Sequence, residues 1–327
     1  MSSKTEISKA VSSVEEKISI VGVDLAKDKF DTYYKGKNRT YPYNKLGLKR
    51  FRSFLSKLPG RVVVAFESTG YISRPFTRTL IEMGVEWRCV PPFFVRSYAT
   101  AMGIEAKTDS IDAKVIAEYA QAKPMRKCEK ASKLQLDLQE LEALKQLCIR
   151  ALSQFKTAKA AYTLPFAKLI LRIITALLEK QIDRLMKKMD ALISADAELA
   201  ARRDLYMEEG GIGKKIAQTL VCTLPELGSC SGKEIAALVG LAPYDHSSGN
   251  MNAPKHIRGG RKNVRKAMYM AGIAVRRCKE GEVKDFYLRL KAEGKAQKLV
   301  AIACARKILT RLNAAARCML QQMPSAT

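Results

Sequence analysis

Four carboxylates occupy positions from which a metal-dependent site for phosphate chemistry could be built. Asp24 ends one short apolar run and Glu67 ends a second. Short runs rich in β-branched residues predict buried strands, so both carboxylates are expected at strand ends, where the backbone is rigid. Asp109 and Asp112 are three residues apart, which places them on one face of a predicted helix over 108–121. Hard oxygen ligands from two strand ends and a helix are typical of a Mg²⁺ site.

Each carboxylate also has an ordinary structural interpretation. An aspartate after a strand is often a turn residue, and Asp109 with Asp112 could form a helix cap with an acidic first turn. The four carboxylates together support the catalytic interpretation more strongly than any one of them does, because two strands and one helix could bring them to a common point. Lys and Arg outnumber Asp and Glu by 58 to 32, so a cluster of carboxylates is less expected here as a generic solvated surface.

The elements that would position these residues follow the alternating pattern of an α/β domain with a mixed sheet. After a polar tail over 1–17, the domain is predicted over 18–132, and ligands in such sheets gather at strand ends. Strands are expected at 18–24, 30–34, 62–67 and 86–90, and helices at 44–58, 72–83 and 108–121, with a break at Pro91 and Pro92.

Two long amphipathic helices are predicted over 133–204. Leucines recur at three- and four-residue steps from Leu134 to Leu147, and a second apolar stripe runs from Ile182 to Leu192. Two antiparallel helices fit this pattern, either pairing with another subunit as a coiled coil or folding back within one core. The sequence leaves both open.

Residues 205–327 are predicted to be mainly helical and basic. Gly210–Gly213 before two lysines resembles a turn whose backbone amides approach a DNA phosphate, although a Gly-rich turn before a helix is common. Residues 238–250 are expected to form a loop by their Gly, Pro, Ser and Asn content. The nucleic-acid-binding candidates in this segment are Gly211, Gly213, Lys214, Lys215, Arg258, Arg261, Lys262, Arg265 and Lys266.

The formal charge of +26 favours a polyanionic partner. Residues 1–132 hold 24 basic against 14 acidic side chains, residues 133–209 hold 13 against 11, and residues 210–327 hold 21 against 7. The basic residues are distributed through segments expected to fold, which favours nucleic acid over a membrane surface. Binding through phosphates predicts an affinity that falls steeply as the salt concentration rises.

The remaining composition argues against a zinc protein and against a membrane protein. The eight cysteines form no Cys-x-x-Cys pair, and the sequence has two histidines. Residues 1–17 are too polar for a signal peptide, and the most apolar stretch, 164–178, is too short and too charged to span a bilayer. We therefore expect a cytoplasmic protein with reduced thiols.

With these residues in view, the chain resembles the DEDD-type insertion-sequence transposases, a family that includes the Piv/MooV DNA invertases. In the first part the similarity rests on Gly-Val-Asp at 22–24, Phe-Glu-Ser-Thr-Gly at 66–70 and Lys-Thr-Asp-Ser-Ile-Asp-Ala at 107–113. In the last part it rests on Gly-Ile-Gly at 211–213, Gly-Leu-Ala-Pro at 240–243, Ser-Gly at 248–249 and Arg-Lys-Ala-Met-Tyr at 265–269. The similarity covers nearly the whole length.

The resemblance implies an RNase H/RuvC-like N-terminal domain whose acidic tetrad is Asp24, Glu67, Asp109 and Asp112. It also implies a C-terminal transposase domain with a nucleophilic serine, which falls on Ser248. Relatives work with DNA and with a structured guide RNA from the element, so the resemblance implies both partners. Because two catalytic centres on separate domains must meet, we expect the long helices of the middle to form a coiled coil in a homo-oligomer, a dimer or a tetramer. From the residues alone, a Ser-Gly pair is usually a turn.

Two other functions fit part of the sequence. A RuvC-like nuclease that hydrolyses branched DNA would use the same carboxylates, but it leaves Ser248 and the basic C-terminal segment unexplained. A non-catalytic nucleic-acid-binding protein would use the carboxylates only as caps. A covalent protein–DNA adduct separates the recombinase from the nuclease, and metal-dependent cleavage excludes the binding protein.

Overall fold

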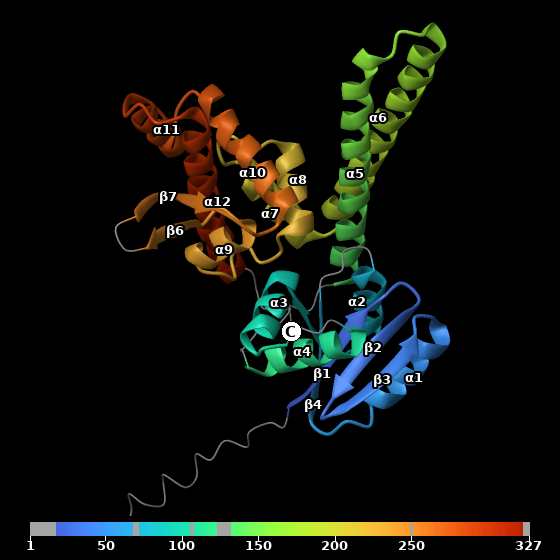
Figure 1. Cartoon of the computed structure of the whole chain (residues 1–327). Coiled ribbons are helices and arrows are strands. Elements are labelled where there is room, and N and C mark those ends of the chain that lie inside the picture. The colour runs from blue at the N-terminus through green and yellow to red at the C-terminus, as the bar shows by residue number, and fades with distance from the viewer. Residues whose placement is uncertain (1–17, 68–71, 105–107, 123–131, 249–250, 323–327) are drawn as a thin grey trace, which may run out of the picture. The chain divides into compact units, whose positions relative to one another are not determined.

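A computed structural model describes residues 18–67, 72–104, 108–122, 132–248 and 251–322, without the side chains of 109–110, 245–248 and 251–255. The chain divides into two compact units, 1–133 and 134–327 (Figure 1). None of the helices in these described ranges is long and apolar enough to cross a membrane.

The first unit is built on a five-stranded mixed sheet in the order β3-β2-β1-β4-β5. β1 (Ile18–Leu25), β2 (Lys29–Tyr34) and β3 (Lys37–Pro42) form an antiparallel meander, whereas β4 (Arg61–Glu67) and β5 (Glu86–Val90) are parallel to β1. The strands predicted at both carboxylates are therefore confirmed. β3 was not predicted, because Lys37–Pro42 is polar and exposed at the sheet edge, where no apolar alternation is required.

Helices cover both faces of this sheet. α1 (Lys45–Leu55) and α2 (Ser73–Glu82) pack on one face around Phe30, Phe51 and Phe76. On the other face lie α3 (Pro92–Ala101) and α4 (Asp109–Ala122), and both sides are visible in Figure 1. The predicted break at Pro91 and Pro92 is confirmed, because β5 ends at Val90. The helix that follows was not predicted: Pro91 caps α3 and Pro92 occupies its first turn, where proline needs no amide donor.

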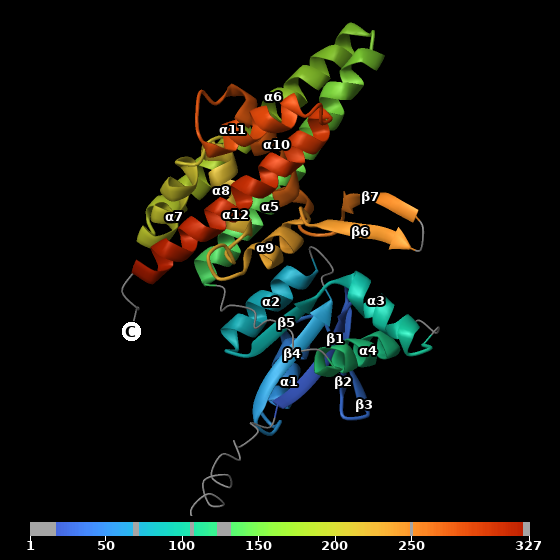
Figure 2. The ribbon, with the colours of Figure 1, turned by 90° about the vertical axis from the view of Figure 1, so that its left-hand side faces the viewer.

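The second unit has a helical core extended by a long helical hairpin. α5 (Lys133–Ala158) leads through a short 3₁₀ turn, η1 (Lys159–Ala161), into α6 (Pro165–Ser194). The two helices run side by side in both views (Figures 1 and 2). A buried ion pair between Glu142 and Lys145 of α5 reaches Thr219 of α8 (Lys214–Thr223), which fixes the base of the hairpin to the core.

The rest of this unit is mainly helical, as expected. α7 (Ala197–Met207), α9 (Gly232–Val239), α10 (Lys262–Ala274), η2 (Val275–Arg277) and α11 (Glu282–Ala292) surround α12 (Gln297–Gln322), much of which is buried. The predicted loop at 238–250 was wrong in part, because β6 (Pro243–Ser248) and β7 (Met251–Ile257) pair as an antiparallel hairpin. Figure 2 shows this hairpin extending away from the helices.

Candidate active site

Asp24 and Glu67 stand side by side at the ends of neighbouring parallel strands. Val23 of β1 pairs with Phe66 of β4, so the next residue along each strand occupies the same level of the sheet. Neighbouring strands are about 4.8 Å apart, which puts the two carboxylate-bearing positions within reach of one cation. The strand-end placement predicted for this pair is confirmed.

Both residues project toward the face covered by α4. A Cβ atom added to Gly22 would lie 2.1 Å from the carbonyl oxygen of Ala113 in α4, so the helix backbone rests directly on β1 there. Asp24 is two residues beyond Gly22, and residues two apart on a strand share a face. Glu67 is likewise two residues beyond Ala65, which pairs with Gly22 and packs against α4.

The first turn of α4 carries the other two carboxylate positions. Asp109 begins the helix four residues before Ala113, and Asp112 lies four residues before Ile116. Ala113 and Ile116 are both fully buried against the sheet. Positions four apart share a helix face, so both aspartates lie on the stripe of α4 that faces β1 and β4.

A four-carboxylate metal cluster stays a proposal. Among the side chains that the structure describes, no three carboxylate, imidazole or thiol groups lie close enough together to hold a metal ion. The Asp109 side chain lies outside those described. The backbone places Asp24 and Glu67 at neighbouring strand ends on the side that α4 covers, and carboxylate oxygens suit Mg²⁺.

A further carboxylate, Asp31, lies opposite Asp24, and the sequence reasoning missed it. The two residues pair across β1 and β2 and therefore share a face of the sheet. The Asp31 carboxylate accepts a hydrogen bond from Thr40 and lies 3.4 Å from the Lys29 ammonium. The sequence did offer a signal: Asp31 lies in the strand predicted over 30–34, which pairs antiparallel with the strand that carries Asp24.

We expect Gly22→Ala to destabilise the first unit and to reduce strand cleavage. The added methyl would collide with helix backbone, which cannot rotate away, and such overpacking costs about 1–3 kcal/mol. Trp87, the single tryptophan, lies in β5 and reports unfolding of this unit by fluorescence. Gly232→Ala is the control, because its Cβ would lie 3.6 Å from Thr310 in ordinary contact. An unchanged Trp87 unfolding midpoint for Gly22→Ala would contradict the close packing.

Ser248 ends β6, at the tip of the β6–β7 hairpin. It pairs with Met251, and 249–250, which connect the two strands, lie outside the described residues. The register shifts between Tyr244 and His246, an irregularity of the kind that re-aims a strand. The side chain of Ser248 is not described, so its role as nucleophile stays a prediction.

The base of this hairpin is held by close backbone packing. A Cβ on Gly240 would lie 2.3 Å from the carbonyl oxygen of Gly259, and one on Gly260 would lie 2.2 Å from the Gly240 nitrogen. Both Gly240 and Gly260 also have positive φ angles of 80° and 69°. Any side chain at these positions would force the two ends of the hairpin apart.

Arg261 and Arg265 reinforce the same base. The Arg261 guanidinium binds both carboxylate oxygens of Glu226 and donates to the carbonyl of Thr223 at 2.7 Å. Arg265 donates to the carbonyl of Gly259. Bidentate pairing of this kind fixes geometry, so both arginines position the hairpin through contacts within the chain.

Some of the other predicted nucleic-acid contacts have partners within the fold, and most are exposed. Lys214 lies 2.8 Å from Asp190 of α6, and Arg258 lies over the Tyr244 ring at 4.9 Å. Gly211 is a packing residue, because its Cβ would lie 2.7 Å from the carbonyl oxygen of Ala271. Gly213, which caps α8, and the lysines Lys215, Lys262 and Lys266 are exposed, and so are Lys214 and Arg258 despite their contacts. Nucleic-acid binding by the set stays a prediction.

The buried cysteines of the second unit are packing residues. Burial raises the pKa of the Cys222 thiol to about 12 and that of Cys304 to about 11. Both groups are therefore neutral thiols at physiological pH, and a neutral thiol is a poor nucleophile.

Two transposase family models match this chain over the regions that carry these features. One, described as "Transposase", matches residues 21–161 and includes both strand ends and α4. The other, described as "Transposase IS116/IS110/IS902 family", matches residues 204–288 and includes the β6–β7 hairpin.

Curated relatives are similar over most of their length. A "Pilin gene-inverting protein" of Moraxella lacunata is 27% identical over 304 residues, covering 89% of this chain and 93% of the relative. A "Probable family 20 transposase" of Pseudomonas aeruginosa is 26% identical over 329 residues, covering 89% and 94%. Together with the two family matches, these similarities identify the chain as a transposase of the IS110 type.

Proposed function

We propose that this transposase is an RNA-guided DNA recombinase that cuts and rejoins DNA through a phosphoserine intermediate. The observation that carries the proposal is the placement of Asp24 and Glu67 at one level of adjacent parallel strands, facing the start of α4. Strand cleavage needs stabilised negative charge on a phosphoryl group, and this arrangement of carboxylates is suited to holding the Mg²⁺ that supplies it.

The topology of the first unit supports an RNase H/RuvC-like fold. An antiparallel meander of three strands continues into two parallel strands, in the order β3-β2-β1-β4-β5, with helices on both faces. In this fold the carboxylates would come from the central strand, its parallel neighbour and a helix, which are the elements that carry Asp24, Glu67, Asp109 and Asp112.

Ser248 would act as the nucleophile. Its hydroxyl oxygen would form a bond to a DNA phosphorus while the bond to one strand's deoxyribose oxygen breaks, and that oxygen would take up a proton. One phosphoester replaces another, so the reverse reaction can join a different strand without ATP. His246 is two residues away and His256 is the sole other histidine in the sequence, so a serine–histidine–aspartate triad is not proposed.

Assembly into a homo-oligomer, a dimer or a tetramer, would let the two catalytic centres meet. They lie on separate units, so the proposal requires contact between them within one chain or between copies. The α5–α6 hairpin exposes apolar side chains that a coiled coil with another copy would cover: Leu144, Leu147, Leu164, Phe166, Leu169, Ile173 and Leu177.

Hydrolysis of branched DNA by a RuvC-like nuclease is the second candidate function. The Asp24 and Glu67 arrangement suits it equally, because the same carboxylates could serve a water nucleophile. The two functions differ in their products: a recombinase rejoins strands, whereas a nuclease leaves free ends.

A strand-exchange assay tests the proposed function. We expect full-length protein to co-purify with a structured RNA, and to join two DNA duplexes that both pair with that RNA. Nuclease removal of the RNA should abolish joining, and adding the RNA back should restore it. The control is an RNA of the same length with scrambled pairing segments. Joining that persists without RNA would contradict the guide, and cleavage without joining would favour the nuclease.

A further inference from the structure

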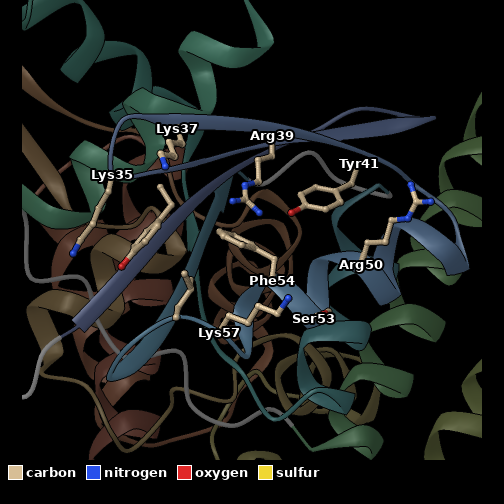
Figure 3. A pocket seen from close by; sticks show the side chains of 10 residues that line it. Lys35, Lys37, Arg39, Tyr41, Arg50, Ser53, Phe54 and Lys57 are labelled. Atoms are coloured by element: carbon tan, nitrogen blue, oxygen red, sulfur yellow. The ribbon is translucent and has the colours of Figure 1, made fainter.

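A cationic hollow lies between the edge strand β3 and helix α1, and it is separate from the proposed active site. Its volume is about 560 Å³, within the size range of small-ligand pockets. We call it the β3–α1 hollow (Figure 3). The residues that line it are Tyr34, Lys35, Lys37, Arg39, Tyr41, Arg50, Ser53, Phe54, Lys57 and Leu58.

The β3–α1 hollow opens on the opposite face of the sheet from Asp24 and Glu67. Arg39 pairs with Thr32, which in turn pairs with Val23, so these residues share a face. Val23 packs into the core under α1 and α2, whereas Asp24 follows it and projects to the α4 side. A ligand in the hollow would therefore be bound apart from the reacting phosphate.

Five cations line the hollow, and no carboxylate is among its described lining residues. Within the described parts of the chain, none of the five is ion-paired: Lys35, Lys37, Arg39, Arg50 and Lys57. Five like charges gathered without counter-charge repel one another. Such a cluster is stabilised when a multiply charged anion binds.

Aromatic rings form part of the same wall. The Arg39 guanidinium lies over the Phe54 ring at 4.5 Å, and the Lys35 ammonium lies 5.6 Å from the Tyr34 ring. A guanidinium stacked on a ring keeps its N–H groups directed outward, where they can donate to phosphate oxygens. Figure 3 shows the Tyr41 hydroxyl turned toward Arg39.

The turn between β2 and β3 presents a lysine where the backbone would favour glycine or asparagine. Lys35 has a φ of 45° and Gly36 a φ of 80°, the pattern of a two-residue hairpin turn with two left-handed positions. A lysine with positive φ is conformationally unfavourable. This turn places a cation at the rim of the hollow.

We propose that the β3–α1 hollow binds the phosphodiester backbone of a single-stranded nucleic acid. Basic groups that follow a backbone, combined with rings that can contact bases or sugars, are the usual features of single-strand binding surfaces. A concave site of this volume suits one or two nucleotides, whereas a duplex presents its phosphates along a broad rigid ridge. The site extends the proposed function, on which it rests for its nucleic-acid partner, by holding a strand away from the carboxylates.

The test measures binding by full-length protein freed of nucleic acid. Fluorescence anisotropy would follow a labelled 20-nucleotide uridine RNA, the thymidine DNA of equal length and a DNA duplex. The variant carries Arg39→Gln, Arg50→Gln and Lys57→Gln together. We expect single-strand affinity to fall about tenfold or more and the log–log salt slope to decrease by about 2, as expected for three lost phosphate contacts.

The matched control carries Lys45→Gln, Lys49→Gln and Arg52→Gln. These three exposed cations lie on α1, which forms one wall of the hollow, but they do not line it. It removes the same net charge and should keep affinity within about twofold, because only general electrostatics change. Loss with the RNA or with the DNA strand supports the site and identifies which strand it holds. Equal loss in both triple variants, equal loss for the duplex, or no loss would overturn the proposal.

Asp24→Asn separates failure of the hollow from failure of the recombinase mechanism. That variant should bind single strands like the parent protein, because Asp24 is on the other face of the sheet. If the triple variant binds normally while the parent protein still joins DNA, the hollow is overturned and the recombinase stands. The single variant Lys57→Gln provides a partial loss if the triple variant is unstable.

Discussion

Strand cleavage is expected to disappear when Asp24 is replaced by asparagine, while nucleic-acid binding is kept. The amide has nearly the shape of the carboxylate, so β1 and its pairing with β4 should persist. Its oxygen carries no net charge and holds a divalent cation poorly. Loss of about 4 kcal/mol of charge stabilisation in the transition state corresponds to about a thousandfold in rate.

Asp109→Asn is expected to behave in the same way, because Asp109 begins α4 and belongs to the proposed four-carboxylate site. Asp28→Asn is the matched control: the same chemical change in the exposed turn that follows β1. The measurement is cleavage of a labelled DNA substrate with Mg²⁺, with EDTA, and after Mg²⁺ is restored. Undiminished cleavage by Asp24→Asn and Asp109→Asn would sink the metal assignment.

Ser248→Ala is expected to abolish the covalent protein–DNA adduct and to leave guide and target binding unchanged. Removing the hydroxyl removes the atom that would bond to phosphorus, and loss of a nucleophile costs at least about a thousandfold in rate. The adduct is detected as a DNA-linked band in a denaturing gel, and mass spectrometry locates the modified peptide.

Ser247→Ala is the control for this experiment. It removes the same hydroxyl one residue earlier in β6, from a serine that is not followed by glycine as Ser248 is. Its effect should therefore be milder. An adduct of normal yield in Ser248→Ala would defeat the phosphoserine mechanism, whereas loss of binding would show that the hairpin itself had been disrupted.

The two predictions fail separately. An adduct that forms without divalent metal would remove the carboxylates from the chemistry but keep Ser248. Metal-dependent cleavage without an adduct would keep the carboxylates and favour the hydrolytic nuclease. Only loss of both activities in the respective variants supports a recombinase with both centres.

The sequence by itself determined the strands at Asp24 and Glu67 and the helix from Asp109. These elements are buried, so their apolar periodicity is a local signal that needs no knowledge of the rest of the fold. Asn44 could likewise be placed at the start of α1, where its side chain accepts a hydrogen bond from the Gly47 amide. The transposase family was also readable from local motifs.

Only the tertiary structure decided which faces these residues occupy. Strand order and register are set by pairing between distant segments, and one residue of slip would turn Asp24 toward the opposite core. Position 22 requires glycine because the backbone of a helix more than 90 residues away packs directly on it. Composition alone gives no sign of that contact.

Tertiary structure also separated the basic residues by role. Arg261 and Arg265 look like phosphate contacts in a basic segment, but partners within the fold engage them at the base of the β6–β7 hairpin. Conversely, Lys37 and Arg39 belong to a polar edge strand with no predictive pattern, and folding brings them beside Lys57 in the hollow. The net charge can be counted from the sequence. Whether a basic side chain stabilises the fold or is available to bind phosphate depends on which groups the fold places beside it.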